Sequence, residues 1–264
     1  MNTTSQNVSR PLVTAMLALT VFLISPGLTH AQDLVGRWAL DGDATAIVGE
    51  DGVENNTVPT TGVVGLADTA LQFNASTSDA FPDPAIHPDS SDVTVPHFAA
   101  LETDGVTLTA WVRPTLDGML VNPSTSDMGA PLVVKYGSTG DGDELGVSYG
   151  LYLLADGSLA FMLEGDGGAA YADALTAAGV VQSGMWHHLA ATYDAATGDV
   201  AIYVNAQDAT LVTNASDPAL GAIDHSFALD PLTADDSNLV IGKGFDGVVD
   251  DVQIWNSAAS SAGI

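Results

Sequence analysis

The chain has 264 residues, and 33 acidic residues against 5 basic ones give it a formal net charge of −28 at pH 7. So strong a negative charge disfavours nucleic acid and anionic membranes as partners, because both are themselves negatively charged. The sequence contains no cysteine, which excludes a disulfide framework, so the fold must be held by its hydrophobic core, with bound metal as a further candidate.

The first 31 residues are predicted to be a secretory signal peptide, removed after Ala31. Arg10 precedes the apolar run of residues 12–24, and the small-residue motif Thr-His-Ala ends at Ala31. An uncleaved membrane anchor is the alternative, which the shortness of the run disfavours. Residues 32–264 would then form a single secreted domain, extracellular or periplasmic and not inserted in a membrane, and the lack of cysteine favours bacterial export. Its net charge becomes −29, since Arg10 leaves with the signal and residues 1–31 contain no acid.

The acidic residues are scattered, which indicates a folded acidic surface and not a disordered acidic tail. Most are aspartates in loops rich in Gly, Ala, Thr and Ser, while hydrophobic residues make up 46% of the chain. Such a surface suits high salt, where cations screen the repulsion between carboxylates, as in halophilic proteins. An acidic protein from an ordinary habitat is the alternative.

Short β-rich runs separated by Gly, Asp, Asn and Pro predict a many-stranded antiparallel protein. Asp156-Gly157 and Thr197-Gly198-Asp199 predict hairpin turns. Within the loop-like residues 75–103, only residues 93–101 have a pattern that could pair. Strands at this spacing favour a sandwich or jelly roll. The predicted strands are residues 34–41, 68–74, 105–114, 131–137, 147–154, 158–165, 186–194, 199–205, 238–244 and 247–255.

Six segments in order carry a family resemblance that covers nearly all of the mature chain. They are LVGRWALDGD, GLADTALQFN, VTLTAWVRP, YGLYLLADGSLAFMLEG, GMWHHLAATYDAATGDVAIYVNAQ and LVIGKGFDGVVDDVQIWNSAASSAGI. In these segments the chain resembles LamG-like members of the concanavalin A-like lectin/glucanase superfamily. The resemblance implies an all-β jelly-roll sandwich of two antiparallel sheets. The last segment departs from the pattern at Gly263, where the family usually has glutamate.

The adjacent residues His187 and His188 could be a metal or catalytic site, or part of the architecture. Alternate residues of a strand point to opposite faces, so the two imidazoles are expected to diverge and cannot chelate one ion together. No orienting carboxylate and nucleophile accompany them in a recognisable motif. The resemblance implies that Trp-His-His is a structural signature, and we interpret the pair as architecture, with one histidine satisfying buried backbone groups.

Few aromatic residues are candidates for stacking on a sugar. The resemblance places Trp38, Trp111 and Trp186 among the core or sheet-packing aromatics, and Trp255 in a position that is commonly tyrosine. The tyrosines that remain as candidates are Tyr136, Tyr149 and Tyr171. Tyr171, in a glycine-rich stretch predicted to be a loop, is the expected ligand-binding aromatic, and a tyrosine that caps the edge of a sheet is the alternative.

The sequence predicts no catalytic residues. Glucanases of the superfamily carry Glu-x-Asp-x-x-Glu on one strand, because alternate carboxylates project into the same cleft, and that pattern is absent here. A lyase would need converging Arg, His and Tyr, but the mature chain has only Arg37 and Arg113 as arginines.

Calcium is the one cofactor that the residues suggest. Strict alternation in residues 247–255 would place Asp250 on an apolar face with Val248, Val252 and Ile254, where a charge needs a partner. The resemblance implies a structural Ca²⁺ held by this aspartate and the loop after the first strand. Here that loop supplies Asp41, the carbonyl of Gly42, and Asp43, which are the hard oxygen ligands that calcium prefers. The alternative is that Asp250 pairs with Arg37 or accepts backbone N–H bonds.

Together these observations predict a secreted, non-catalytic binding module that recognises an extracellular glycan or protein, with a polysaccharide or glycoprotein as the expected partner. A polysaccharide-degrading hydrolase or lyase on the same fold is one alternative. A structural component of the cell surface or matrix is another.

Overall fold

The computed structural model describes residues 32–75, 91–116, 129–137, 146–164, 171–212, 236–260 and 263–264. All of them lie in one compact unit, Ala31–Ile264, and the predicted signal peptide lies outside them. Among these residues there is no helix of the length and apolarity needed to cross a membrane.

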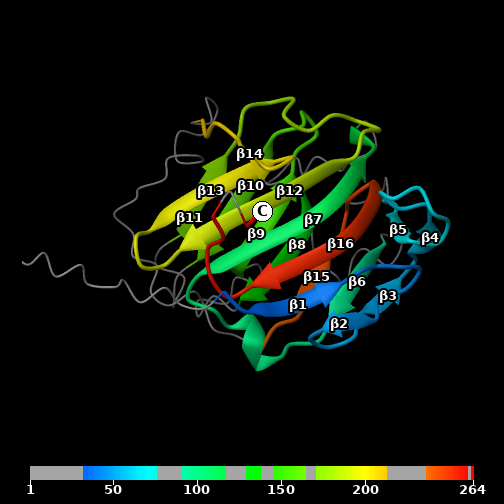
Figure 1. The fold of residues 1–264 in the computed structure, drawn as a ribbon, viewed down its shortest axis with the longest axis horizontal. Helices are drawn as coiled ribbons and strands as arrows, with labels where there is room; N and C mark the ends of the chain where they lie inside the picture. The colour runs from blue at the N-terminus through cyan, green and yellow to red at the C-terminus, as the bar shows by residue number, and fades with distance from the viewer. Residues whose placement is uncertain are drawn as a thin grey trace, which may run out of the picture. The chain divides into compact units, whose positions relative to one another are not determined.

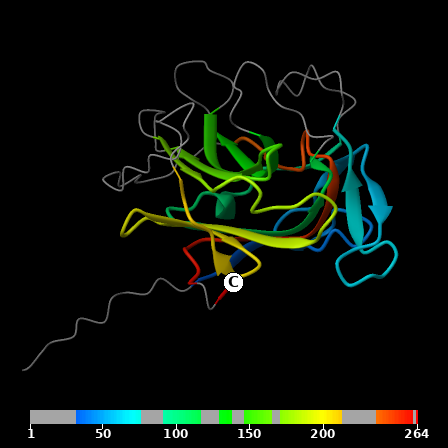
Figure 2. The ribbon, with the colours of Figure 1, turned by 90° about the horizontal axis from the view of Figure 1, so that it is seen from above.

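Two antiparallel sheets face each other and form a sandwich (Figures 1 and 2). The larger, sheet A, has the strand order β14-β13-β12-β7-β16-β1-β2, with β5 paired to β16 and β4 paired to β5. Its strands are β1 (Leu34–Trp38), β2 (Ala46–Val48), β4 (Val58–Thr60), β5 (Ala70–Phe73), β7 (Val106–Pro114), β12 (His187–Asp194), β13 (Asp199–Val204), β14 (Gln207–Asp208) and β16 (Gly247–Trp255).

Sheet B lies behind sheet A in Figure 1 and has the order β11-β10-β9-β8-β15-β6-β3. One short 3₁₀ helix, η1 (Ala99–Leu101), is also present among the described residues. The strands of sheet B are β3 (Val53–Asn55), β6 (Asp92–Val95), β8 (Ala130–Gly137), β9 (Gly146–Leu153), β10 (Leu159–Glu164), β11 (Tyr171–Leu175) and β15 (Leu239–Ile241). This arrangement confirms the predicted two-sheet jelly roll.

Each of the ten predicted β-rich runs contains a strand, and both predicted hairpin turns are present. The N–H of Gly157 donates to the carbonyl of Leu154 between β9 and β10, and that of Gly198 donates to Asp194 between β12 and β13. Both glycines have positive φ, 79° and 76°, a conformation that is costly for residues with a side chain. In the described part of the loop-like residues 75–103 there is one strand, β6, which overlaps the residues expected to be able to pair.

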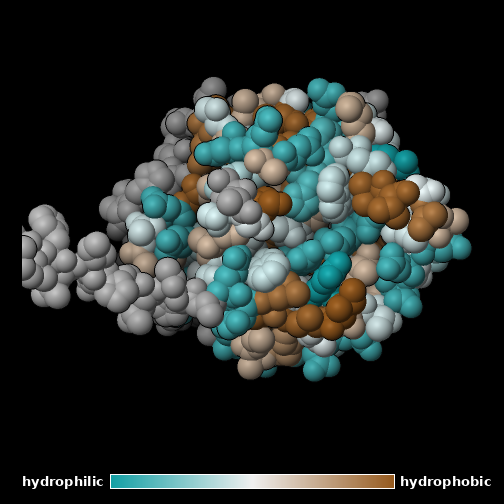
Figure 3. Space-filling view, viewed as in Figure 1, coloured by the Kyte–Doolittle hydropathy of each residue, from teal (hydrophilic) through white to brown (hydrophobic). Residues whose placement is uncertain are grey.

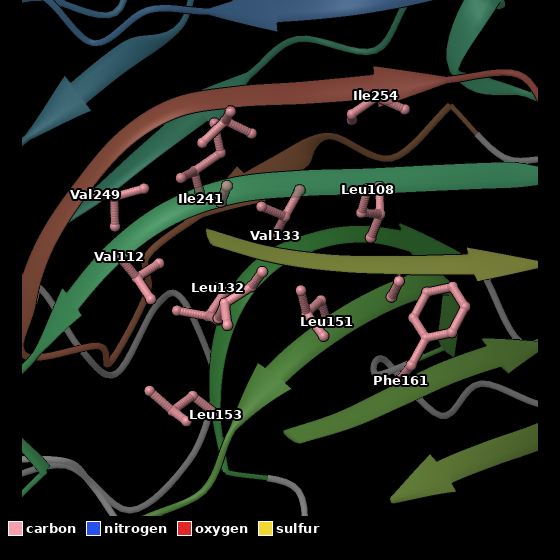
Figure 4. Packing of buried hydrophobic residues seen from close by; sticks show 14 of the residues in the cluster. Leu108, Val112, Leu132, Val133, Leu151, Leu153, Phe161, Ile241, Val249 and Ile254 are labelled. Carbon is pink, nitrogen blue, oxygen red and sulfur yellow. The ribbon is translucent and has the colours of Figure 1, made fainter. Parts of the chain in front are cut away.

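The core fills the space between the two sheets (Figure 4). Alternate residues of β7, among them Leu108 and Val112, point inward and meet Leu151, Leu153 and Phe161 from sheet B. Burying aliphatic and aromatic side chains in this way supplies most of the stability, at roughly 25 cal/mol per Å² of apolar surface removed from water.

The segment that follows β16 turns back onto the face of sheet A that points away from sheet B. Thr107 Oγ1 donates to the carbonyl of Ser257 at 2.6 Å and accepts the N–H of Ala259 at 2.8 Å. The C-terminus accordingly lies on this face in both views (Figures 1 and 2). This face is called the outer face of sheet A below.

Candidate functional site at the bulge of strand β16

A β-bulge interrupts β16 at its central aspartates. Asp250 is opposite Trp111 on β7, whereas Gln253 is opposite Thr109, so β16 has one residue more than its partner between these pairs. Asp251, at the bulge, has φ 44°. A bulge changes which residues face inward, and bulges are frequent beside functional sites.

Because of the bulge, the strict alternation predicted for this strand is wrong. Val249 lies in the core, and so do Val252 and Ile254 beyond the bulge. Asp250 therefore does not share a face with Val252 and Ile254 as predicted, because the extra residue shifts the inward positions from odd to even numbers.

Asp250 is nevertheless buried, with a relative exposure of 6%. Its Oδ2 accepts the backbone N–H of Val63 at 2.9 Å. Burial raises the pKa of the Asp250 carboxyl, the bond from Val63 opposes this, and the nearby charges of Asp251 and Asp41 raise it further. The predicted alternative of a backbone N–H bond to Asp250 is thus present.

Glycine is required at position 62 because oxygen atoms crowd the space beside it. A Cβ on Gly62 would lie 2.6 Å from Asp250 Oδ2 and 2.7 Å from Thr69 Oγ1, and would also meet the carbonyl of Thr69. Gly62 and Val63 thus bring carboxylate, hydroxyl and carbonyl oxygens together at the edge of the bulge. These are oxygen donors of the kind that calcium prefers.

Arg37 pairs with Asp251 and not with Asp250. The distance from Arg37 Nε to Asp251 Oδ1 is 2.8 Å, and the two side chains are 37% and 27% exposed. Gln253 Nε2 donates to the other oxygen, Asp251 Oδ2, at 2.9 Å. Both oxygens of this carboxylate therefore have a partner on the outer face of sheet A.

The carboxylates predicted to bind calcium, Asp41, Asp43 and Asp250, lie on β16 and in the loop after β1. Asp41 is close enough to Asp250 to affect its pKa. Asp43 is exposed, and its Oδ1 accepts the N–H of Thr45 at 2.9 Å. Among the described residues, no group of three or more His, Cys, Asp or Glu side chains is arranged to hold a metal ion.

The two histidines point to opposite faces of β12, as predicted. His187 is buried, and its Nε2 accepts the N–H of Gln182 at 3.1 Å, so it satisfies a backbone donor. Burial lowers the pKa of His187. His188 lies on the outer face, where burial lowers its pKa and the charge of Asp251 opposes the shift.

Tryptophans on the outer face of sheet A are the feature that sequence reasoning missed. Trp38 is fully buried as expected, but Trp111 points away from the core and its ring lies 5.1 Å from that of His188. Trp186 packs under the guanidinium of Arg113 at 5.3 Å. The alternation of Trp111 with the inward residues Ala110 and Val112 is the signal that could have revealed this.

The three candidate tyrosines lie in different environments. Tyr149 is excluded as a platform because it is fully buried and its hydroxyl donates to the carbonyl of Leu101. Tyr136 is partly buried against a small cluster on sheet B. Tyr171 is the first residue of β11, at the edge of sheet B and not in a loop, and its side chain lies outside the described part of the chain.

An all-β sandwich of two antiparallel sheets with this strand order is a jelly roll. The sequence model of the concanavalin A-like lectin/glucanases superfamily matches residues 88–264. The chain belongs to this family, as the resemblance implied. No curated protein matches the chain.

Solved structures with the same fold are distant in sequence. Domain 4 of an extracellular arabinanase from Geobacillus stearothermophilus, in complex with arabinotriose, has a TM-score of 0.53 at 15% identity, over 88% of this chain and 96% of that one. The binding domain of botulinum neurotoxin serotype D has a TM-score of 0.53 at 10% identity, over 87% of this chain and 50% of that chain. At these identities the similarity establishes the fold alone.

Proposed function

We propose that the mature chain is a secreted, non-catalytic module that binds an extracellular glycan. Its membership of the concanavalin A-like lectin/glucanases superfamily is the observation that carries this proposal. The arabinanase domain of similar fold, seen in complex with arabinotriose, lends support. A glycoprotein is the related partner, because its glycans offer the same hydroxyl-rich surface.

The lack of a recognisable acid pair supports binding without turnover. The sequence has only five glutamates, none within the Glu-x-Asp-x-x-Glu pattern. Near the bulge, Asp251 is held by Arg37 and Gln253, which suits a fixed hydrogen-bonding group better than a proton donor. A hydrolase or lyase, and a structural matrix component, remain the alternatives that the following test addresses.

Purified mature protein should be retained by at least one neutral polysaccharide and should release no product from it. The panel should include neutral and uronic-acid polysaccharides, with reducing ends and the absorbance of unsaturated products followed over time. Anionic glycans should bind least, since they meet a surface of the same charge. Turnover that persists through purification would support the enzymatic alternative, and no binding to any glycan would favour the structural one.

A structural Ca²⁺ at the bulge is part of the proposal. Asp250 and Asp41 would hold it, together with backbone oxygens of the loops after β1 and β4. The oxygen donors beside Gly62 and the burial of Asp250 fit a cation, because a buried carboxylate is stabilised by a positive charge. Bound there, the ion would offset the charges of these two aspartates and tie β16 to both loops.

Calcium should therefore raise the melting temperature more than NaCl of matched ionic strength does. At about 100 times the dissociation constant, a ligand of the folded state adds about 2.7 kcal/mol, or roughly 5–10 °C for a domain of this size. Asp250→Asn keeps an oxygen for the N–H of Val63 and should abolish the increment. Asp251→Asn is the matched control and should keep most of it, whereas equal loss in both variants would indicate nonspecific binding to the acidic surface.

A further inference from the structure

We propose that the outer face of sheet A carries a subsite for a neutral saccharide, built on β7, β12, β16 and β1 around Trp111 and Arg37. This inference rests on the proposed glycan-binding function and gives it a location.

The strand register places the residues of this subsite beside one another. His188 is opposite Trp111, which in turn is opposite Asp250, and Arg37 is opposite Gln253 in the adjoining row. Figure 3 shows this face, on which hydrophilic groups lie between hydrophobic patches, one of them over the β4–β5 connection. That connection carries Val64 and Leu66, which are 71% and 62% exposed.

The aromatic part of the subsite is the pair Trp111 and His188. Their ring centroids are 5.1 Å apart and their planes are tilted by 48°, so the two rings do not stack face to face. Both side chains are partly exposed. An indole on a sheet face offers an apolar surface for the C–H groups of a pyranose or furanose ring, with its N–H as a polar edge.

The polar part is the group formed by Arg37, Asp251 and Gln253. Arg37 uses Nε for Asp251, and its guanidinium has further N–H donors at its exposed end. Gln253 donates to Asp251 through Nε2, and its carbonyl oxygen is an acceptor. Sugar hydroxyls both donate and accept, so a fixed array of donors and acceptors beside an aromatic ring matches their chemistry.

The bulge in β16 is the reason that this polar group lies on the outer face. Without it, alternation would turn Asp251 toward the core, directly after the outward Asp250. The left-handed conformation of Asp251 (φ 44°) instead leaves both consecutive carboxylates outside the core. A non-glycine residue seldom adopts such a conformation unless the surrounding structure imposes it, and these residues cluster at binding sites.

The charge of the chain favours a neutral ligand over an anionic one. The net charge of −28 repels uronic acids and sulfated sugars at long range. The positive charge of Arg37 is already matched by Asp251 at 2.8 Å, so it does not offset that repulsion. A neutral oligosaccharide is not repelled by this charge.

The test uses neutral oligosaccharides of β-1,4-glucan, β-1,4-xylan and α-1,5-arabinan, titrated into the mature protein by calorimetry and by tryptophan fluorescence. Trp111→Ala should weaken binding by about tenfold or more, as truncation of a central aromatic anchor does. Arg37→Gln should weaken it several-fold. Trp111→Phe should retain most of the affinity and lose the fluorescence change, and Trp186→Ala on the same face is the control that should leave affinity unchanged.

Melting temperatures measured in parallel separate lost binding from lost folding. If Trp111→Ala lowers stability, the affinity of Arg37→Gln and the loss of the fluorescence change in Trp111→Phe still test whether the saccharide binds at this subsite. If Trp111→Ala and Arg37→Gln both bind with the affinity of the wild type, the proposed subsite is wrong, whereas the proposed glycan-binding function is still supported. Failure of the wild type to bind any oligosaccharide or polysaccharide would overturn both.

Discussion

Replacing Lys243 with methionine should destabilise the fold by about 3–5 kcal/mol, the usual cost of leaving a buried charge without its partner. Lys243 Nζ lies 3.1 Å from Asp92 Oδ2, and the two side chains are only 11% and 6% exposed. Asp92 Oδ1 accepts further bonds from Asn55 Nδ2 at 2.7 Å and Thr94 Oγ1 at 3.0 Å. With Lys243 gone, these two neutral donors would face a buried carboxylate alone.

Thermal and urea unfolding should show the loss as a fall of roughly 6–20 °C in melting temperature for a domain of this size. The control is the double variant Lys243→Met/Asp92→Asn, which removes both charges. It should be more stable than Lys243→Met alone, since an amide at position 92 has no charge to desolvate and keeps an acceptor for Asn55. A cost below about 1 kcal/mol for Lys243→Met would show that water or neighbouring donors satisfy Asp92.

Replacing Trp38 with alanine should cost about 3–5 kcal/mol, the range for truncating a large aromatic in a packed core. Trp38 is fully buried on β1, and its Nε1 donates to the carbonyl of Glu50 at 3.0 Å. Its ring also covers Gly36, where a Cβ would lie 2.5 Å from the indole. The substitution therefore removes core volume, one hydrogen bond and the cover over a glycine together.

Urea unfolding should show the loss as a lower midpoint with an unchanged m-value. Trp38→Phe should cost less, because a ring still fills most of the space. Trp186→Ala, on the outer face beside Arg113, is the matched control and should cost about 1 kcal/mol or less. Similar losses for Trp38→Ala and Trp186→Ala would mean that Trp38 is not the anchor of β1.

The two ion pairs, one beside each sheet, should affect different properties of the protein. Lys243, in the turn after β15, and Asp92, on β6 of sheet B, form a buried ion pair, and variants there should change stability. Arg37 and Asp251 form a half-exposed pair on sheet A, and because exposed ion pairs contribute at most about 1 kcal/mol, variants there should change binding more than stability. Measuring both quantities for both pairs distinguishes structural from functional charges.

Sequence by itself determined the fold class and the ten main strands. Period-two alternation and turn residues are local signals, so residues such as Leu108, Ala110 and Val112 identify an inward face without knowledge of the partner. The short strands β2, β3, β4, β11 and β14 were not predicted, since each has at most five residues, too few to show a clear alternation of apolar and polar side chains. The divergence of His187 and His188 followed from the same local geometry.

The arrangement of the candidate site around Asp250 and Asp251 follows only from the tertiary structure. The bulge at Asp251 is a shift in the register between β16 and β7, between Asp250 and Gln253, which no local pattern reveals. Arg37 meets Asp251 across 214 positions of sequence, and Lys243 meets Asp92 across 151. Alternation along one strand assumes an uninterrupted ladder, so a single extra residue reverses the predicted face of every side chain beyond it. Only the pairing of the strands shows where that residue lies.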